Sequence, residues 1–119
     1  MQNERRAAIR SEAKRLEKYF IASGAMLLEA DSLLSAETLL DLYGEDIRAR
    51  AYVTNDPVIG ERMMRPDFTV PIVERHMSEG AEPARYTYNG PVWRMQDAGS
   101  KRETEFIQVG FELFDRSNS

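Results

Sequence analysis

The sequence has no cysteine, a single histidine and no long apolar run, and each shortage excludes a class of function. Without cysteine the chain forms no disulfide, thiol nucleophile or zinc–thiolate site, and because this composition fits a cytoplasmic protein, we expect that location. His76 alone cannot build a metal site, so we expect it to pack or to lie on the surface. No stretch approaches the roughly 20 apolar residues that cross a bilayer, and residues 1–10 are too charged for a secretory signal, so we expect no membrane partner.

Two further absences limit the ligands. The net charge of -4 opposes the positive surface that phosphate backbones require, so no nucleic-acid partner is expected, although a local basic site stays open. The chain also lacks the glycine-rich patterns GxGxxG, GxxxxGKS and GxxxxGKT, which cradle the phosphates of nucleotides. We therefore expect neither a bound cofactor nor a metal.

The residues that are present predict one folded domain with a modest core, because 42% of the chain is hydrophobic. Apolar spacing predicts helices over residues 3–23, 36–43 and 70–79. In the first helix the apolar stripe leaves Glu17 on a solvated side. Ser35 is the expected N-cap of the second helix and Gly44 its end, whereas Thr69 lies near the start of the third.

Short apolar segments between these helices predict strands over residues 25–29, 51–54, 62–65, 84–88, 92–96 and 103–114. Asn89, Gly90 and Pro91 form the expected turn between the strands at 84–88 and 92–96. The order of elements shows no regular strand–helix–strand alternation. It favours an α+β fold in which helices flank a mainly antiparallel sheet.

The last predicted strand carries polar groups on one face. Gln108, Gly110 and Glu112 share that face by alternation, while Ile107 and Val109 belong to the opposite, mostly apolar face. An amide and a carboxylate on either side of a glycine suit a small, positively charged ligand, since glycine allows close approach. The alternative is an ordinary antiparallel strand with one solvated face.

Arg94 and Gln96 share one face of the preceding predicted strand. An arginine on a rigid strand binds carboxylate or phosphate through its planar fork, so Arg94 is a candidate anion clamp. Its alternative is a surface ion pair.

Three segments of the chain are similar to the class II histidyl-tRNA synthetases, and they follow one another along the chain in the order of that family. Residues 86–94 read Tyr-Thr-Tyr-Asn-Gly-Pro-Val-Trp-Arg, and residues 105–112 read Glu-Phe-Ile-Gln-Val-Gly-Phe-Glu; together they resemble motif 2 of that family. Residues 64–69, Met-Arg-Pro-Asp-Phe-Thr, resemble its histidine-binding element. The resemblance implies a fold like the class II aminoacyl-tRNA synthetase catalytic core. It also implies that residues 1–119 form the N-terminal part of that domain, incomplete because the motif 3 segment is absent.

The resemblance assigns histidine-binding roles to five residues. Asp67 stands where the family has a glutamate for the α-amino group, and Thr69 matches the threonine beside it. Arg94 matches the arginine that binds the carboxylate and the activating phosphate. Gln108 and Glu112 match residues that hold the histidine backbone and imidazole.

The nucleotide side of the family pattern is altered. Gln96 stands where motif 2 has a glutamate, and Thr104 where the loop has an arginine, although Lys101 and Arg102 remain basic. Cations beside transferring phosphates stabilise the transition state, so the losses argue against adenylation and we expect no catalytic residues.

The altered pattern is typical of the synthetase-like regulatory subunits of short-form ATP phosphoribosyltransferase, which implies histidine feedback. The implied partners are the short catalytic subunit and histidine as effector, with a homodimer inside a hetero-oligomer. Two alternatives stay open: a histidyl-tRNA synthetase, and a scaffold or dimerisation module without ligand.

Overall fold

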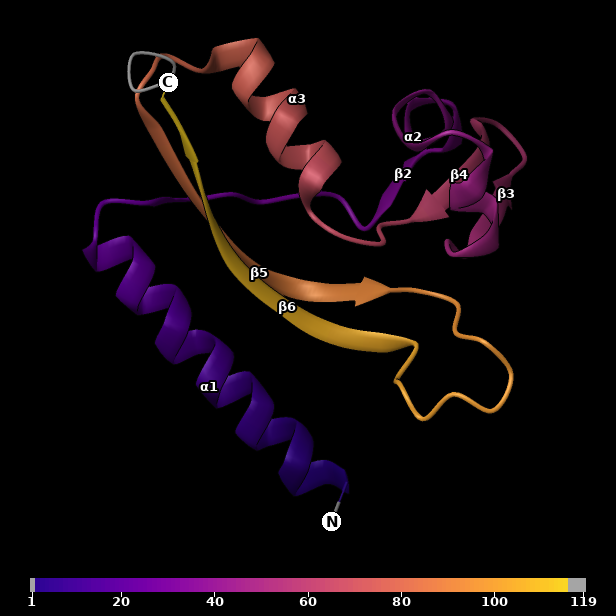
Figure 1. The fold of residues 1–119 in the computed structure, drawn as a ribbon, viewed down its shortest axis with the longest axis horizontal. Helices are drawn as coiled ribbons and strands as arrows, with labels where there is room; N and C mark the ends of the chain where they lie inside the picture. The colour runs from indigo at the N-terminus through magenta and orange to yellow at the C-terminus, as the bar shows by residue number, and fades with distance from the viewer. Residues whose placement is uncertain (1, 116–119) are drawn as a thin grey trace. The chain divides into compact units, whose positions relative to one another are not determined.

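The computed structural model describes residues 2–115, which divide into two compact units. Among these residues, the first unit contains 2–29, 71–90 and 107–115, and the second contains 30–70 and 91–106. The elements, labelled in Figure 1, are α1 (Gln2–Ala22), β1 (Met26–Leu27), β2 (Leu33–Ser35), α2 (Ala36–Tyr43), η1 (Glu45–Ala49), β3 (Val53–Asp56), β4 (Gly60–Met64), α3 (Thr69–Glu79), β5 (Ala84–Trp93) and β6 (Glu105–Phe114). Residues 1 and 116–119 lie outside the described residues.

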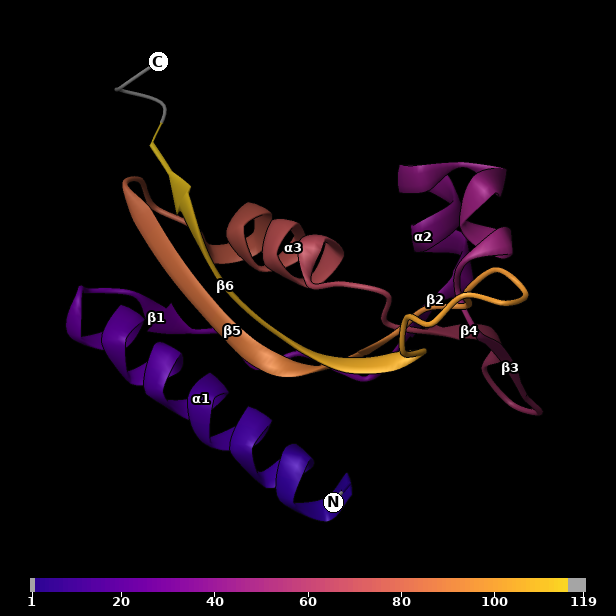
Figure 2. The ribbon, with the colours of Figure 1, turned by 60° about the horizontal axis from the view of Figure 1, so that its bottom comes forward.

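The first unit is built on a sheet with the order β1-β5-β6. β1 pairs with β5 in parallel, with Met26 opposite Tyr86, whereas β5 and β6 run in opposite directions (Figure 2). The two-residue β1–β5 pairing is parallel, whereas β5–β6 and both pairings of the second unit are antiparallel, so the strands pair mainly in the antiparallel way that was expected. Helices α1 and α3 lie on opposite sides of β5 and β6 (Figures 1 and 2). Alternation along β6 explains this arrangement, because Phe111 stacks on Phe20 of α1 while Phe114, on the other face, stacks on His76 of α3.

The prediction that Glu17 faces solvent is wrong. Its side chain is buried on α1, at 8% exposure. The carboxylate accepts a hydrogen bond from Asn89 Nδ2 at 3.1 Å and pairs with Lys14 Nζ at 3.4 Å. A buried carboxylate is tolerable where it has such partners, and Asn89 is too distant in sequence for helical periodicity to reveal it.

The predicted turn at residues 89–91 is also wrong, because β5 runs without a break from Ala84 to Trp93. Pro91 lacks a backbone N–H, which excludes it from most central strands. β1, however, pairs with β5 only at residues 86 and 87, so no β1 partner requires a donor at position 91.

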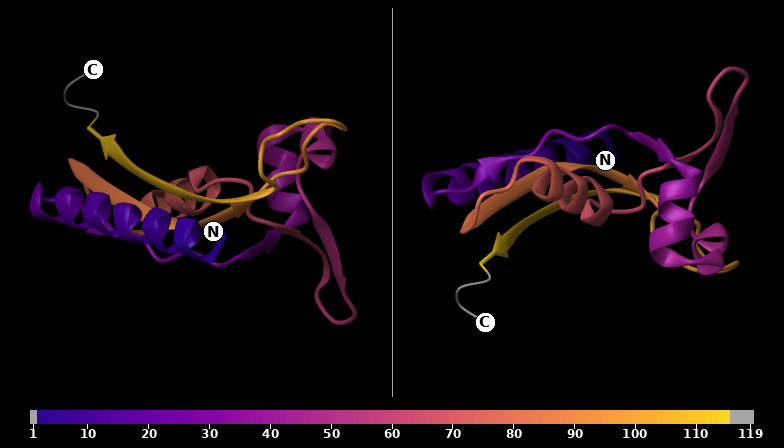
Figure 3. Two further views of the ribbon diagram at one scale, coloured as in Figure 1. Left: turned by 90° about the horizontal axis from the view of Figure 1, so that it is seen from below. Right: turned by 90° about the horizontal axis from the view of Figure 1, so that it is seen from above.

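The second unit contains an antiparallel sheet with the order β2-β4-β3. The β3–β4 hairpin projects away from α2 of the same unit (Figure 3). α2 begins and ends where predicted, since the Ser35 hydroxyl accepts the Thr38 N–H and Gly44 adopts a positive φ of 77°. β2 and η1 were not predicted, and β3 begins two residues later than the expected strand. The buried core consists of Ala36, Leu39, Ile47, Ala51, Met63 and Val70.

A helix that crosses a membrane must be both long and apolar. Within residues 2–115, no helix is both long enough and apolar enough to cross a membrane.

Candidate functional site

Asp67 and Thr69 lie in the second unit, at the start of α3. The Asp67 carboxylate accepts the Thr69 backbone N–H at 3.0 Å, which satisfies a donor that a helix start leaves unpaired. The same carboxylate accepts the Tyr43 hydroxyl, with distances of 3.0 Å to Oδ1 and 3.1 Å to Oδ2. The side chain that the family resemblance assigns to the α-amino group is therefore held in one orientation.

Tyr43 contributes a protonated phenol to this cluster. Burial raises the pKa of the Tyr43 phenol, a hydrogen bond with Thr69 opposes the rise, and the charge of Asp67 adds to it. Because the charged phenolate is disfavoured, the hydroxyl remains a hydrogen-bond donor at neutral pH.

Arg94, in the same unit, is held by its inner nitrogen. Nε donates to the Pro66 carbonyl at 2.7 Å, and the guanidinium lies over the Phe106 ring, 5.2 Å from its centroid. The backbone N–H of Arg94 donates to the Thr104 carbonyl at 2.8 Å. Among residues 2–115 the two terminal nitrogens form no ion pair, so both donors are available for an anion.

Gln96 and Thr104, which replace charged residues of the resembled family, both take structural roles. The Gln96 amide donates to the Glu103 carbonyl at 3.3 Å, and Thr104 accepts from Arg94 through its backbone. These contacts close the base of the loop at residues 97–103. Neither residue adds a charge there.

Gln108 and Glu112 lie in the first unit, on β6. Gln108 Oε1 is buried and has no hydrogen-bond partner among the described residues, which is a costly state for an amide oxygen. Glu112 is exposed. Between them, a side chain at Gly110 would overlap the phenol ring of Tyr88. The absent side chain thus makes room for Tyr88, whereas the sequence suggested room for a ligand.

A buried polar cluster around His76 in the first unit was not predicted beyond a packing role. His76 Nε2 lies 3.0 Å from Glu82 Oε1, and Nδ1 lies 3.0 Å from the Tyr86 hydroxyl. A carboxylate only accepts, so Nε2 carries a proton that it donates to Glu82. The imidazole also stacks on Phe114 at 4.1 Å. Nothing in local sequence links these four positions, although the lone histidine on a predicted helix marked one of them.

Arg65 is the second buried polar residue that sequence reasoning did not single out. It is 6% exposed, and its guanidinium donates to the carbonyls of Pro91 at 2.9 Å and Ala30 at 2.8 Å. The same group lies over the rings of Phe68 and Trp93, at 4.6 and 5.8 Å from their centroids. The arginine before Pro66 therefore joins distant backbone segments of the second unit.

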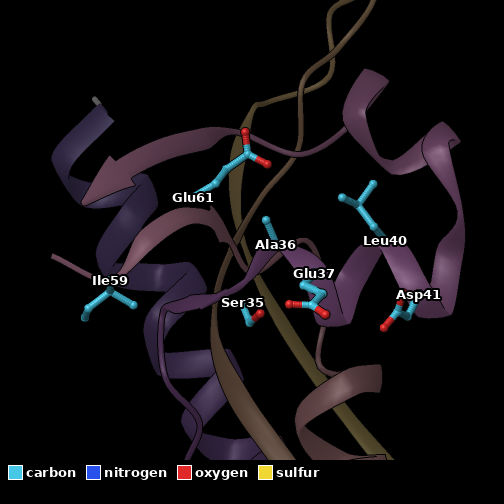
Figure 4. A pocket seen from close by; sticks show the side chains of 7 residues that line it. All are labelled: Ser35, Ala36, Glu37, Leu40, Asp41, Ile59 and Glu61. Atoms are coloured by element: carbon cyan, nitrogen blue, oxygen red, sulfur yellow. The ribbon is translucent and has the colours of Figure 1, made fainter. Parts of the chain in front are cut away.

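A pocket of about 390 Å³ opens between α2 and the β3–β4 hairpin of the second unit. Figure 4 shows Glu37 and Asp41 on α2 and Ile59 and Glu61 on the hairpin. Its carboxylates disfavour an anion, and none of the five predicted histidine-binding residues lines it. No group of three metal-ligating side chains occurs among the described residues.

Sequence comparisons identify relatives over most of the chain. The family model described as Histidyl-tRNA synthetase matches residues 1–119. An ATP phosphoribosyltransferase regulatory subunit of Mesorhizobium japonicum is 36% identical over 109 residues, or 90% of this chain and 28% of the relative. The protein of the same name from Brucella ovis is 36% identical over 92 residues, or 76% of this chain and 24% of the relative. The chain thus spans about a quarter of the length of these relatives.

Solved structures resemble the fold. An ATP phosphoribosyltransferase regulatory subunit/histidyl-tRNA synthetase of Bacillus halodurans matches with a TM-score of 0.70 and 23% identity, covering 90% of this chain and 28% of that one. A pyrrolysyl tRNA synthetase of Desulfitobacterium hafniense matches with a TM-score of 0.66 and 18% identity, covering 86% and 37%. These likenesses confirm the predicted α+β fold of the class II synthetase core.

Proposed function

The chain belongs to the histidyl-tRNA synthetase family, and we propose that within it the chain is part of a regulatory subunit of ATP phosphoribosyltransferase. The observation that carries this proposal is the 36% identity to proteins of that name in Mesorhizobium japonicum and Brucella ovis. In this role the complete protein binds the short catalytic subunit in the cytoplasm, activates it and takes part in feedback by histidine. A homodimer within the hetero-oligomer completes the proposed assembly.

We propose that the subunit is not itself a catalyst. Adenylation requires cations and metal-binding groups placed around the transferring phosphate. Gln96 and Thr104 replace charged residues of the resembled family at that end, and their hydrogen bonds serve the base of the loop. These replacements are consistent with a protein that binds an amino acid but does not catalyse its adenylation.

Histidine binding is proposed separately for the two groups of residues. In the second unit, Asp67 and Thr69 face the α-amino group and Arg94 the carboxylate, supported by the oriented Asp67 and by the available donors of Arg94. In the first unit, the buried and unpartnered Gln108 Oε1 supports a hydrogen bond from the ligand, with Glu112 nearby on the same strand face. Each group is testable without the other.

The experiment uses the complete protein and its short catalytic partner. Mixing them should raise the rate of phosphoribosyl-ATP formation, and added histidine should lower it. Absence of both effects would overturn the regulatory proposal.

A histidyl-tRNA synthetase is the second candidate, favoured by the family model and by the double description of the Bacillus halodurans structure. Histidine-dependent exchange of pyrophosphate into ATP by the complete protein would support it over the regulatory role. A scaffold without ligand is separated from both by calorimetric titration with histidine, which would show no heat.

A further inference from the structure

Tyr43, on α2, contacts Asp67, the residue predicted to bind the α-amino group of histidine. It is the last residue of α2, which ends where the Gly44 N–H donates to the Leu40 carbonyl at 2.8 Å. Its ring packs against the buried core of the second unit, so its position does not depend on a ligand. From there the hydroxyl reaches both oxygens of Asp67.

The Asp67 carboxylate keeps capacity for another donor. Oδ1 accepts from Tyr43 and from the Thr69 N–H, whereas Oδ2 accepts only from Tyr43 among the described residues. A carboxylate offers about four acceptor positions, so an incoming cation can still bind. Rotation of the carboxylate would break three contacts at once, which fixes the direction in which this capacity points.

The phenol oxygen of Tyr43 can also accept a hydrogen bond from a ligand. The phenol proton is used by Asp67 and Thr69 makes a side-chain hydrogen bond to the phenol, so one of the two lone pairs of its oxygen remains for a further N–H. An N–H-bearing cation beside Asp67 therefore finds two acceptors, the carboxylate and the phenol oxygen, held about 3 Å apart by their own hydrogen bond. A primary ammonium, with three donors, uses such a pair better than a group with one donor.

We propose that Tyr43 is a positioning residue that confers selectivity for a primary ammonium group at Asp67. The inference deepens the proposed function and rests on it, since the ammonium in question is the α-amino group of histidine. Tyr43 acts by holding the Asp67 carboxylate and by supplying a second acceptor. Removing the hydroxyl should therefore weaken ligands with an α-amino group and spare those without it.

The test is calorimetric titration of the complete protein with L-histidine and with imidazolepropionate, which lacks the α-amino group. Tyr43→Phe keeps the ring in the core and should weaken histidine binding about tenfold, the effect of losing one charge-assisted hydrogen bond, without changing imidazolepropionate binding. Tyr52→Phe removes a hydroxyl elsewhere in the same unit and should change neither. Asp67→Asn provides an independent measurement, because it should abolish the preference for histidine over imidazolepropionate.

The outcomes separate the two proposals. If wild-type protein binds histidine but Tyr43→Phe binds it equally well, or loses both ligands equally, the role of Tyr43 is overturned and the regulatory proposal stands. A histidine preference that survives in Asp67→Asn also overturns it. If the wild-type protein binds no histidine, the effector site and the inference fall together.

Discussion

Both units bury polar side chains, and His76 in the first unit and Arg65 in the second find their hydrogen-bond partners in opposite ways. In the first unit His76 bonds to two other side chains, those of Tyr86 and Glu82, and stacks on Phe114. In the second unit Arg65 bonds mainly to backbone carbonyls. A cluster of side chains depends on several residue identities at once, whereas a backbone anchor depends on one. The contribution of His76 to stability should thus depend on the identity of its partner side chains. The contribution of Arg65 should depend only on the N–H donors of its own guanidinium.

The largest effect is expected from Arg65→Lys. A single ammonium cannot reach the carbonyls of Pro91 and Ala30 as the planar guanidinium does, so we expect the free energy of unfolding to fall by about 2–3 kcal/mol. Urea denaturation of the complete protein measures it. Arg62→Lys is the matched control, since Arg62 reaches the Leu33 carbonyl only at 3.4 Å, and it should cost less than about 0.5 kcal/mol. Equal costs for the two variants would show that the buried guanidinium of Arg65 contributes no more to stability than that of the less buried Arg62.

The next largest effect is expected from His76→Phe. Phenylalanine retains the stack on Phe114 but removes both hydrogen bonds, leaving the buried Tyr86 hydroxyl without this partner. We expect a loss of about 2 kcal/mol in the same denaturation assay. Met77→Ala, one residue along α3 and 71% exposed, should lie within about 0.5 kcal/mol of wild type. A stability of His76→Phe equal to that of Met77→Ala would show that the side-chain cluster contributes nothing.

A smaller effect is expected from Gly110→Ala in the first unit. The added methyl group overlaps Tyr88, and the displacement should cost about 1–2 kcal/mol. Combining it with Tyr88→Ala tests the reason, because residues in contact give non-additive effects. The cost of Gly110→Ala should nearly vanish in the Tyr88→Ala background. An unchanged cost there would mean that Gly110 is required by something other than Tyr88.

The smallest effect on stability is expected at Asp56, which lies in an exposed turn and is not a buried polar side chain like His76 or Arg65. The carboxylate of Asp56 accepts the N–H groups of Ile59 and Val58, and these hydrogen bonds hold its pKa below the ordinary 3.8. A lowered pKa in the folded state stabilises the protein above pH 3.8, and the contribution is lost as the pH falls through the folded value. Asp56→Asn keeps an acceptor but does not titrate. The stability difference from wild type should therefore shrink in acid, and a difference independent of pH would contradict this account.

Local patterns predicted the elements whose cause is local. α2 follows from Ser35 as N-cap and Gly44 as C-cap, and its observed bounds match the prediction. The caps act within one turn of helix, so sequence neighbours suffice to identify them. The α+β class was likewise predictable, because it depends only on the order of elements.

Patterns failed where distant residues decide the outcome. Glu17 is buried because Asn89 donates to it, and residues 89–91 extend β5 although their composition is typical of a turn. Periodicity describes one element at a time, so it cannot show which element will supply a partner. The same reason hid the His76 cluster, whose members come from α3, the following loop, β5 and β6.

The sequence by itself determined the family, the α+β class and the identities of Asp67, Thr69, Arg94, Gln108 and Glu112 as candidate ligand contacts. Only the tertiary structure decided what surrounds them. It set Tyr43 against Asp67, left the outer nitrogens of Arg94 available and buried Gln108 Oε1 without a partner. The physical reason is that the sequence specifies the type of each residue directly, whereas its hydrogen-bond partners depend on which distant segments the fold brings together.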